Sequence, residues 1–161
     1  DYKLRAAVLE GRALRVQEKY DEAIARFEQA LASSMSGSDA VRIQTRAKIG
    51  KAACLAELGK TQEAVDILEK VIAENDPADA SLFAEAYVAL GAAHRKANQP
   101  TDAALAYLHV DLLFFREREA HAEALYYLTS LWPELNHPER AVQTRSMLKD
   151  RYGGTTWAKR Q

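Results

Sequence analysis

The histidines are the side chains of this sequence best suited to act as metal ligands or general bases. None of the four lies at a spacing that places two imidazoles on one zinc ion, and no HExxH segment occurs. Asp111, two residues after His109, is the carboxylate companion that we consider for a base. A lone histidine on a helix is more often a polar surface residue or a buried, hydrogen-bonded one. We therefore predict no metal site and no catalytic residue among His94, His109, His121 and His137.

The single cysteine and the glycines offer no other reactive site. Cys54 stands among small apolar residues, from Ala52 to Ala56, so we expect a buried hydrophobic side chain rather than a nucleophile. The glycines never cluster into a phosphate-binding loop, and the acidic pair Glu117 and Glu119 lies at a charge-rich helix start. We predict that the protein is not an enzyme and binds no cofactor.

Charge and hydropathy argue against two further classes of partner. Lys and Arg number 22 and Asp and Glu number 23, a balance that gives no sign of a nucleic-acid partner. The longest apolar stretch, from Ala124 to Pro133, is too short to span a bilayer, so we expect no direct membrane insertion. A protein or a peptide remains the expected partner.

The elements that must position any binding residues are helices. Alanine supplies 30 of the 161 residues, whereas Gly and Pro together supply 11, so helix formers are many and helix breakers few. The apolar pattern predicts helices over eight ranges: 2–17, 21–33, 39–58, 61–75, 79–97, 101–116, 119–135 and 139–151.

A repeat organises these helices. Ala23, Ala64, Ala103 and Ala141 lie 41, 39 and 38 residues apart, a period typical of stacked two-helix repeats. The side chains four residues after these alanines are Phe27, Leu68, Tyr107 and Arg145. We expect the alanines to face small residues of the preceding helix, with the larger side chain filling the hole one turn on. The facing residues are Gly11, Ala52, Gly91 and Thr129.

Each repeat should turn at a tight antiparallel corner. Gly59, Asn98 and Asn136 are residues that tolerate the left-handed backbone conformation closing a helix. Pro100 and Pro138 then stand where a new helix begins, with φ already set. Near the C-terminus, Thr155 or Thr156 can cap one more short helix, and we expect Trp157 to cover the end of the stack.

These residues resemble the signature of the tetratricopeptide-repeat family over nearly the whole chain. The matching positions are Gly11, Tyr20, Ala23, Phe27 and Ala30 in the first repeat, and Tyr87, Leu90, Gly91, Ala103 and Tyr107 in the third. Lys48 and Lys51 depart from the family pattern in the second repeat, and Trp132 and Arg145 in the fourth. The period exceeds the usual one, as in the longer-repeat variants of bacterial cell-envelope proteins.

The resemblance implies an all-α fold, a right-handed superhelical solenoid of antiparallel helix pairs with about four repeats. We expect a single domain over 1–161, with repeats at 1–35, 39–76, 79–118 and 119–152 and a capping segment at 153–161. The compartment stays open between the bacterial periplasm or cell envelope and the cytoplasm.

The resemblance also implies a function, because the first helix of every pair in this family lines a concave groove that binds an extended peptide or a partner helix. The groove residues would be Arg5, Arg12, Arg15, Arg46, Glu85, Arg95, Glu123, Tyr126 and Ser130. Five of them are arginines, whose guanidinium groups bind carboxylates bidentately, so one hypothesis is a basic stripe for a partner's carboxylates. The alternative is a solvated polar face with local ion pairs that contribute little.

Two other roles are kept beside this non-enzymatic scaffold. Aromatic residues crowd the second half of the chain, where they form either the core or an exposed patch. They are Tyr107, Phe114, Phe115, Tyr126, Tyr127, Trp132, Tyr152 and Trp157. The first alternative role is structural self-assembly, as a homo-oligomer through this aromatic C-terminal end. The second is a helical accessory domain of a larger enzyme.

Overall fold

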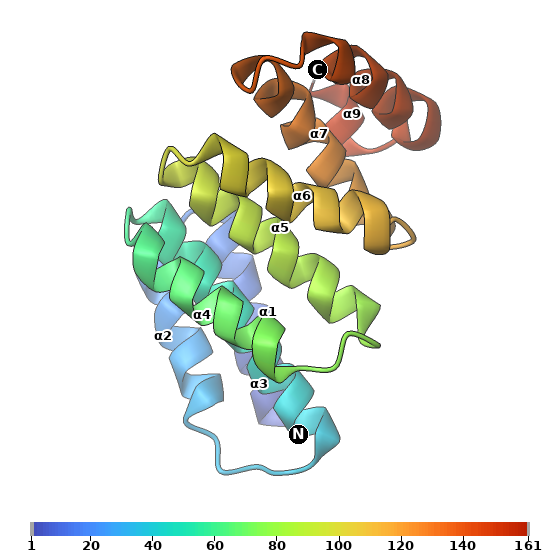
Figure 1. Cartoon of the computed structure of the whole chain (residues 1–161). Coiled ribbons are helices and arrows are strands. Elements are labelled where there is room, and N and C mark those ends of the chain that lie inside the picture. The colour runs from blue at the N-terminus through green and yellow to red at the C-terminus, as the bar shows by residue number, and fades with distance from the viewer. Residues whose placement is uncertain (1, 161) are drawn as a thin grey trace. The chain divides into compact units, whose positions relative to one another are not determined.

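The structure, a computed structural model, describes residues 2–160, and over that range the regular elements are α-helices without strands (Figure 1). In chain order the helices are α1 (Tyr2–Val16), α2 (Tyr20–Leu31), α3 (Ser38–Glu57), α4 (Thr61–Glu74), α5 (Ala80–Lys96), α6 (Pro100–Leu113), α7 (Arg118–Glu134), α8 (Pro138–Tyr152) and α9 (Thr156–Lys159). The predicted all-α fold class is confirmed. The eight predicted helices agree with these bounds to within two residues, except at the end of α6.

Helix α6 ends at Leu113, whereas the apolar pattern predicted a helix to residue 116. Phe114 leaves the helical conformation at φ -122° and ψ 26°. Its ring is buried against two aromatic rings of α5, with centroid distances of 5.9 Å to Phe83 and 6.0 Å to Tyr87. Hydrophobic periodicity cannot report such a tertiary contact, which explains the error.

The helices pack in successive pairs, α1 with α2, α3 with α4, α5 with α6 and α7 with α8. The chain forms two compact units, an N-terminal unit up to Asn75 and a C-terminal unit from Asp76 on, and each is described by itself. The prediction of one domain over 1–161 stays a prediction.

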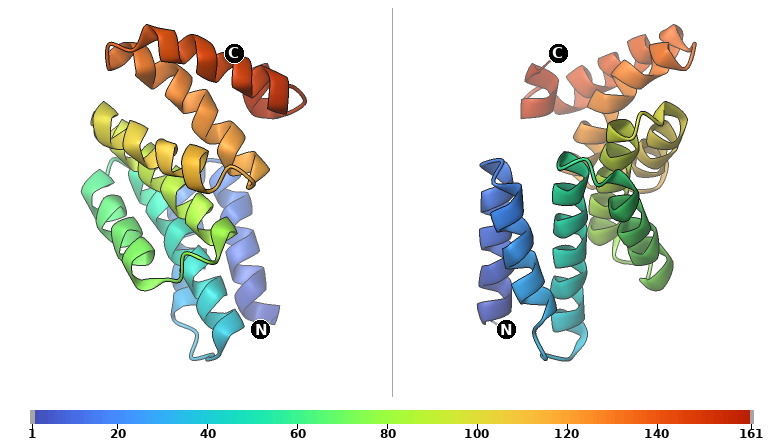
Figure 2. Two further views of the ribbon diagram at one scale, coloured as in Figure 1. Left: turned by 45° about the vertical axis from the view of Figure 1, so that its right-hand side comes forward. Right: turned by 90° about the vertical axis from the view of Figure 1, so that its left-hand side faces the viewer.

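Within each unit, one helix pair stacks on the other. In the N-terminal unit α3 packs on both α1 and α2, and the views in Figure 2 show these three helices side by side. In the C-terminal unit α7 packs on α5 and α6, and α9 lies against α7 and α8. Pairwise stacking of this kind is the arrangement of a tetratricopeptide-like solenoid.

The corners inside the pairs share one geometry. Gly59, Asn98 and Asn136 have φ of 82°, 57° and 62°, as predicted, and Glu18 adopts 60° at the first corner. At each corner the next amide reaches the carbonyl five residues back, as in Lys19 N to Leu14 O at 3.0 Å. This hydrogen bond and the left-handed residue before it make a Schellman motif, which satisfies carbonyls that the helix end leaves open.

Close approach between helices depends on positions without a Cβ atom. A Cβ placed on Gly11 or Gly50 would lie 2.7 or 2.4 Å from the ring of Phe27, which is fully buried between α1 and α3. In the C-terminal unit, a Cβ on Gly91 would lie 2.7 Å from the ring of Tyr107. In these two pairs the large side chain of the second helix lies against the glycine of the first. The contact of the four alanines with the small residues of the preceding helices stays a prediction.

We predict that Gly91→Ala destabilises the C-terminal unit by about 1 to 3 kcal/mol, because the fully buried ring of Tyr107 must move from its packed position. Gly154→Ala is the matched control, since a Cβ there meets nothing within 4 Å. Urea titration followed by circular dichroism measures both variants. Equal midpoints for the two would contradict the packing described here.

Candidate functional site

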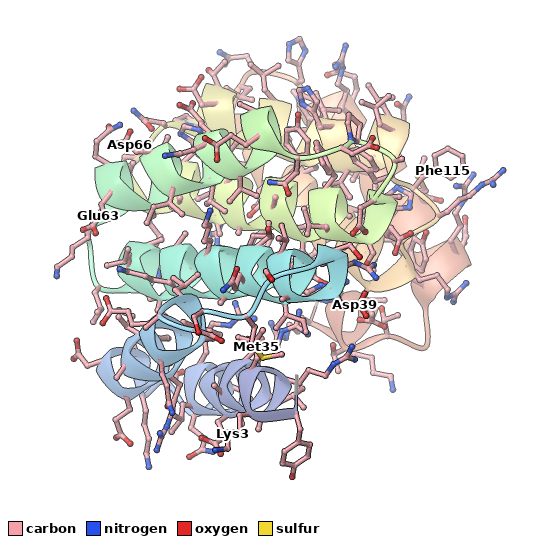
Figure 3. The ribbon with its side chains drawn as sticks, turned by 90° about the horizontal axis from the view of Figure 1, so that it is seen from below. Lys3, Met35, Asp39, Glu63, Asp66 and Phe115 are labelled. Carbon is pink, nitrogen blue, oxygen red and sulfur yellow. The ribbon has the colours of Figure 1, made fainter. Side chains whose placement is uncertain are left out.

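The predicted groove residues of the N-terminal unit lie on α1 and α3, the first helices of their pairs. Arg5, Arg12 and Arg15 are exposed on α1, and Arg46 is half-buried on α3. A guanidinium nitrogen of Arg5 lies 3.9 Å from a carboxylate oxygen of Asp39. Figure 3 labels Asp39 near the start of α3. These residues therefore give the paired first helices of this unit a basic character.

In the C-terminal unit the predicted residues lie on α5 and α7, which contact each other. Glu85 and Arg95 are half-buried on α5, Glu123 and Tyr126 are half-buried on α7, and Ser130 is exposed. The Ser130 hydroxyl donates to the carbonyl of Tyr127 at 2.9 Å, so it is bonded to its own helix.

The most developed site in this unit is an aromatic cluster around Arg95, which we call the Arg95 cluster. The guanidinium carbon of Arg95 lies 3.8 Å from the ring centre of Tyr127. That ring stacks on Tyr107, at 5.4 Å and 20°, and meets Tyr126 edge to face at 5.1 Å. Trp157 of α9 packs against both Tyr126 and Tyr127, at 5.4 and 5.7 Å. Rings from α6, α7 and α9 thus pack around the guanidinium group that α5 supplies.

Two opposite charges act on the phenols of this cluster, Arg95 on α5 and Glu123 on α7. Burial raises the pKa of Tyr107, an effect that nearby Arg95 opposes, and burial likewise raises the pKa of Tyr127. Both phenols therefore stay neutral at physiological pH. The Nε of Arg95 is buried, and a side-chain hydrogen bond between Arg95 and the Tyr107 hydroxyl lowers the pKa of that phenol against the larger effect of burial. An anion beside this guanidinium would offset the cost of its burial.

The sequence predicted Arg95 as a groove residue but did not predict the aromatic rings that pack around its guanidinium group. The adjacent pair Tyr126 and Tyr127 was expected either to fill the core or to expose one ring, and both rings are half-buried beneath Trp157. The predicted N-cap of α9 was the one sequence feature that pointed to this packing, because it places Trp157 on a short helix. In the structure the Thr155 hydroxyl accepts from the amide of Ala158 at 3.3 Å, as that prediction requires. Arg160, whose guanidinium carbon lies 4.6 Å from the Trp157 ring centre, had no such signal.

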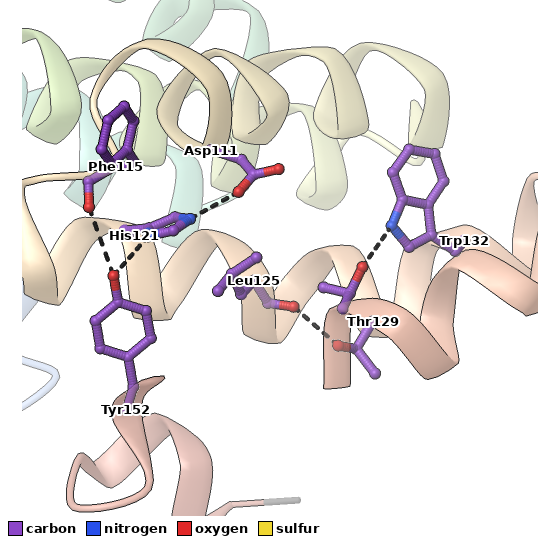
Figure 4. A network of polar contacts seen from close by, with 8 residues as sticks. Asp111, Phe115, His121, Leu125, Thr129, Trp132 and Tyr152 are labelled. Atoms are coloured by element: carbon purple, nitrogen blue, oxygen red, sulfur yellow. Dashed lines mark hydrogen bonds and ion pairs between the residues drawn. The ribbon is translucent and has the colours of Figure 1, made fainter. Parts of the chain in front are cut away.

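A second polar site is buried where α6, α7 and α8 meet (Figure 4). The Nε2 atom of His121 lies 2.7 Å from a carboxylate oxygen of Asp111, and its Nδ1 lies 2.6 Å from the hydroxyl of Tyr152. Asp111 thus pairs with His121 rather than with its sequence neighbour His109, because residues two apart point to opposite sides of a helix. His109 instead stacks on Tyr87, at 4.5 Å and 7°.

The geometry of this His121 network indicates a structural role. A carboxylate can only accept, so Nε2 of the imidazole donates to Asp111. Nδ1 is hydrogen-bonded to the Tyr152 hydroxyl, which also lies 3.5 Å from the carbonyl oxygen of Phe115. The His121 side chain is 1% exposed, so both ring nitrogens are occupied and no substrate reaches them. Among residues 2–160, no group of three or more His, Cys, Asp or Glu side chains could hold a metal ion. The network fastens three helices together.

A comparison with models of protein families finds a match for this chain. Residues 8–80 and 57–110 match a family model described as tetratricopeptide repeat, so the matched span runs from α1 into α6 and covers more than half of the chain. No curated protein matches the sequence. No helix in the described range is long and apolar enough to cross a bilayer.

We predict that His121→Ala lowers the free energy of unfolding of the C-terminal unit by about 2 to 4 kcal/mol, since it opens a cavity and leaves two polar groups without their partner. His137→Ala is the control, because that imidazole is exposed, with the Glu139 carboxylate at 3.3 Å and the Trp132 ring edge to face at 6.2 Å. Urea unfolding of both variants measures the difference. Similar small losses of unfolding free energy in both variants would show that the His121 network adds little to stability.

We predict that Cys54 reacts slowly with thiol reagents in the native protein. Its side chain is fully buried in α3, and burial raises the thiol pKa to about 11 from an ordinary value of 9.0. The thiolate fraction at pH 8 is then about a hundredfold lower than for an unshifted thiol. Labelling with dithiobisnitrobenzoate, followed by absorbance in buffer and in urea, tests this. A native rate close to the unfolded rate would contradict the burial.

Proposed function

The chain belongs to the tetratricopeptide-repeat family, and we propose that it is a non-enzymatic scaffold that binds an extended peptide or partner helix along the first helices of its repeats. Tetratricopeptide repeats generally mediate protein–protein interaction, and the family is generally an interaction module rather than an enzyme. The proposed contact residues are the predicted ones, taken unit by unit: Arg5, Arg12, Arg15 and Arg46, and Glu85, Arg95, Glu123, Tyr126 and Ser130.

The Arg95 cluster is the observation that carries this proposal. A long flexible side chain normally loses rotamer freedom when it binds, and that loss weakens the complex. Stacking on Tyr127 at 3.8 Å restricts Arg95 before a partner arrives, so less entropy remains to be lost. A preorganised guanidinium in an aromatic setting is the kind of residue that dominates protein interfaces.

The chemistry of the partner follows from the arginines. Guanidinium forks form bidentate hydrogen bonds with carboxylates, so acidic side chains on the bound segment would supply the complementary groups. In the N-terminal unit the exposed pair of Arg5 and Asp39, at 3.9 Å, contributes little to stability, so a partner's carboxylate can replace Asp39 in it at small cost.

We predict that peptides selected by the intact chain from a phage-displayed library of random sequences are rich in Asp and Glu. Arg95→Ala should weaken their binding about tenfold, equivalent to the loss of one charge-assisted hydrogen bond, and Arg12→Ala should reduce the salt dependence. Isothermal titration of a synthetic selected peptide measures both effects.

Arg145→Ala is the matched control for this experiment. Arg145 is exposed on α8, outside the first helices, so its loss should leave the affinity unchanged. Failure to enrich any peptide would count against the proposed function. Enriched peptides that bind the Arg95 and control variants equally would remove the Arg95 cluster from the binding surface.

A further inference from the structure

Helix α6 exposes apolar side chains that peptide binding along the first helices does not use. Leu105, Leu112 and Leu113 are 52%, 66% and 66% exposed, and Phe115, in the turn that follows, is 45% exposed. Phe115 projects away from the ribbon in Figure 3. A second helix of a repeat normally turns a polar side to water, so a run of exposed leucines needs another explanation.

Five of the exposed residues of α6 and the turn after it follow a symmetric order, and Thr101, Leu112 and Phe115 are exposed beside them. Asp102, Leu105, His109, Leu113 and Arg116 are all exposed, and their intervals are three, four, four and three residues. These intervals place the first four on one side of the helix. The set begins with an acid and ends with a base, with leucines at equal distances on either side of His109. We call these five residues the α6 stripe.

We propose that the α6 stripe pairs with the α6 stripe of a second copy of this chain. In an antiparallel arrangement about a two-fold axis near His109, Leu105 of one copy meets Leu113 of the other. The same axis sets Asp102 opposite Arg116 twice. A two-fold contact requires a surface that complements itself. Leu105 and Leu113 lie at equal helical spacing about His109, and Arg116, in the turn after α6, supplies the charge opposite to that of Asp102.

The centre of the stripe is held rigid, which favours a specific contact. His109 stacks on Tyr87 at 4.5 Å, and its Nδ1 lies 2.8 Å from the carbonyl oxygen of Leu105. Asp111, the other acid on α6, is engaged by His121 and is only 22% exposed. It therefore adds no repulsion at the surface where the two copies meet.

The apolar surface in and beside the stripe sets the strength of the proposed dimer. Leu105 and Leu113 of the stripe, with the neighbouring Leu112 and Phe115, present on the order of 400 Å² of apolar surface, about half of what one partner buries in a standard stable complex. We expect a weak, reversible dimer with a dissociation constant in the micromolar range.

Sedimentation velocity of the 161-residue chain from about 5 to 500 μM tests the proposal, since that range brackets a micromolar constant. The wild type should shift from monomer to dimer, and Leu113→Glu should remain monomeric. Val142→Glu is the control, because Val142 is 65% exposed on α8 and lies outside the stripe. A wild type that stays monomeric throughout, or equal loss of dimer in both variants, would overturn the proposal.

Exchanging the charges at the two ends of the stripe distinguishes loss of the dimer contact from loss of folding. Asp102→Lys and Arg116→Glu should each weaken association about tenfold, because each places like charges opposite one another. The double variant should regain most of the wild-type association, since exchanging both ends restores the complementarity. Damage to the helix cannot produce such a rescue. A double variant weaker than both single variants would overturn the antiparallel arrangement.

Discussion

An aromatic ring packed against a helix position that lacks a Cβ is the contact on which the rest of each unit depends. Phe27 fills this place between Gly11 and Gly50, and Tyr107 fills it against Gly91, with a would-be Cβ within 3 Å in each case. The missing Cβ lets two helix axes approach, and the ring then fills the space that their approach leaves. Because rings are larger than any aliphatic side chain at this place, one ring can touch three helices at once.

The same contact connects packing to the candidate site. Tyr107 is fully buried against Gly91, and its outer face supports Tyr127, which in turn carries Arg95. The position of the guanidinium is therefore set by the glycine contact two rings away. Trp157 closes the cluster from α9, so a four-residue helix at the end of the described chain serves the site as well as the core.

At the C-terminal end of α6, apolar and polar residues have different roles. Phe114 turns inward and ends the helix, while the His121 network ties the end of α6 to α7 and α8. Leu105, Leu112 and Leu113 of the same helix face solvent. An exposed apolar face either binds another surface or lowers the solubility of the protein.

The sequence by itself determined the local features: the helices, the four corners and the small residues opposite large ones. These depend on backbone preferences and spacing within a single repeat, which is why the sequence predicts the left-handed conformation of Asn98 and Asn136. The tertiary structure alone decided that Asp111 pairs with His121, that Tyr127 carries Arg95 and that Phe114 stops α6. Each of these joins side chains from different helices, and helical periodicity gives the face that a residue occupies but not the neighbour that it meets there.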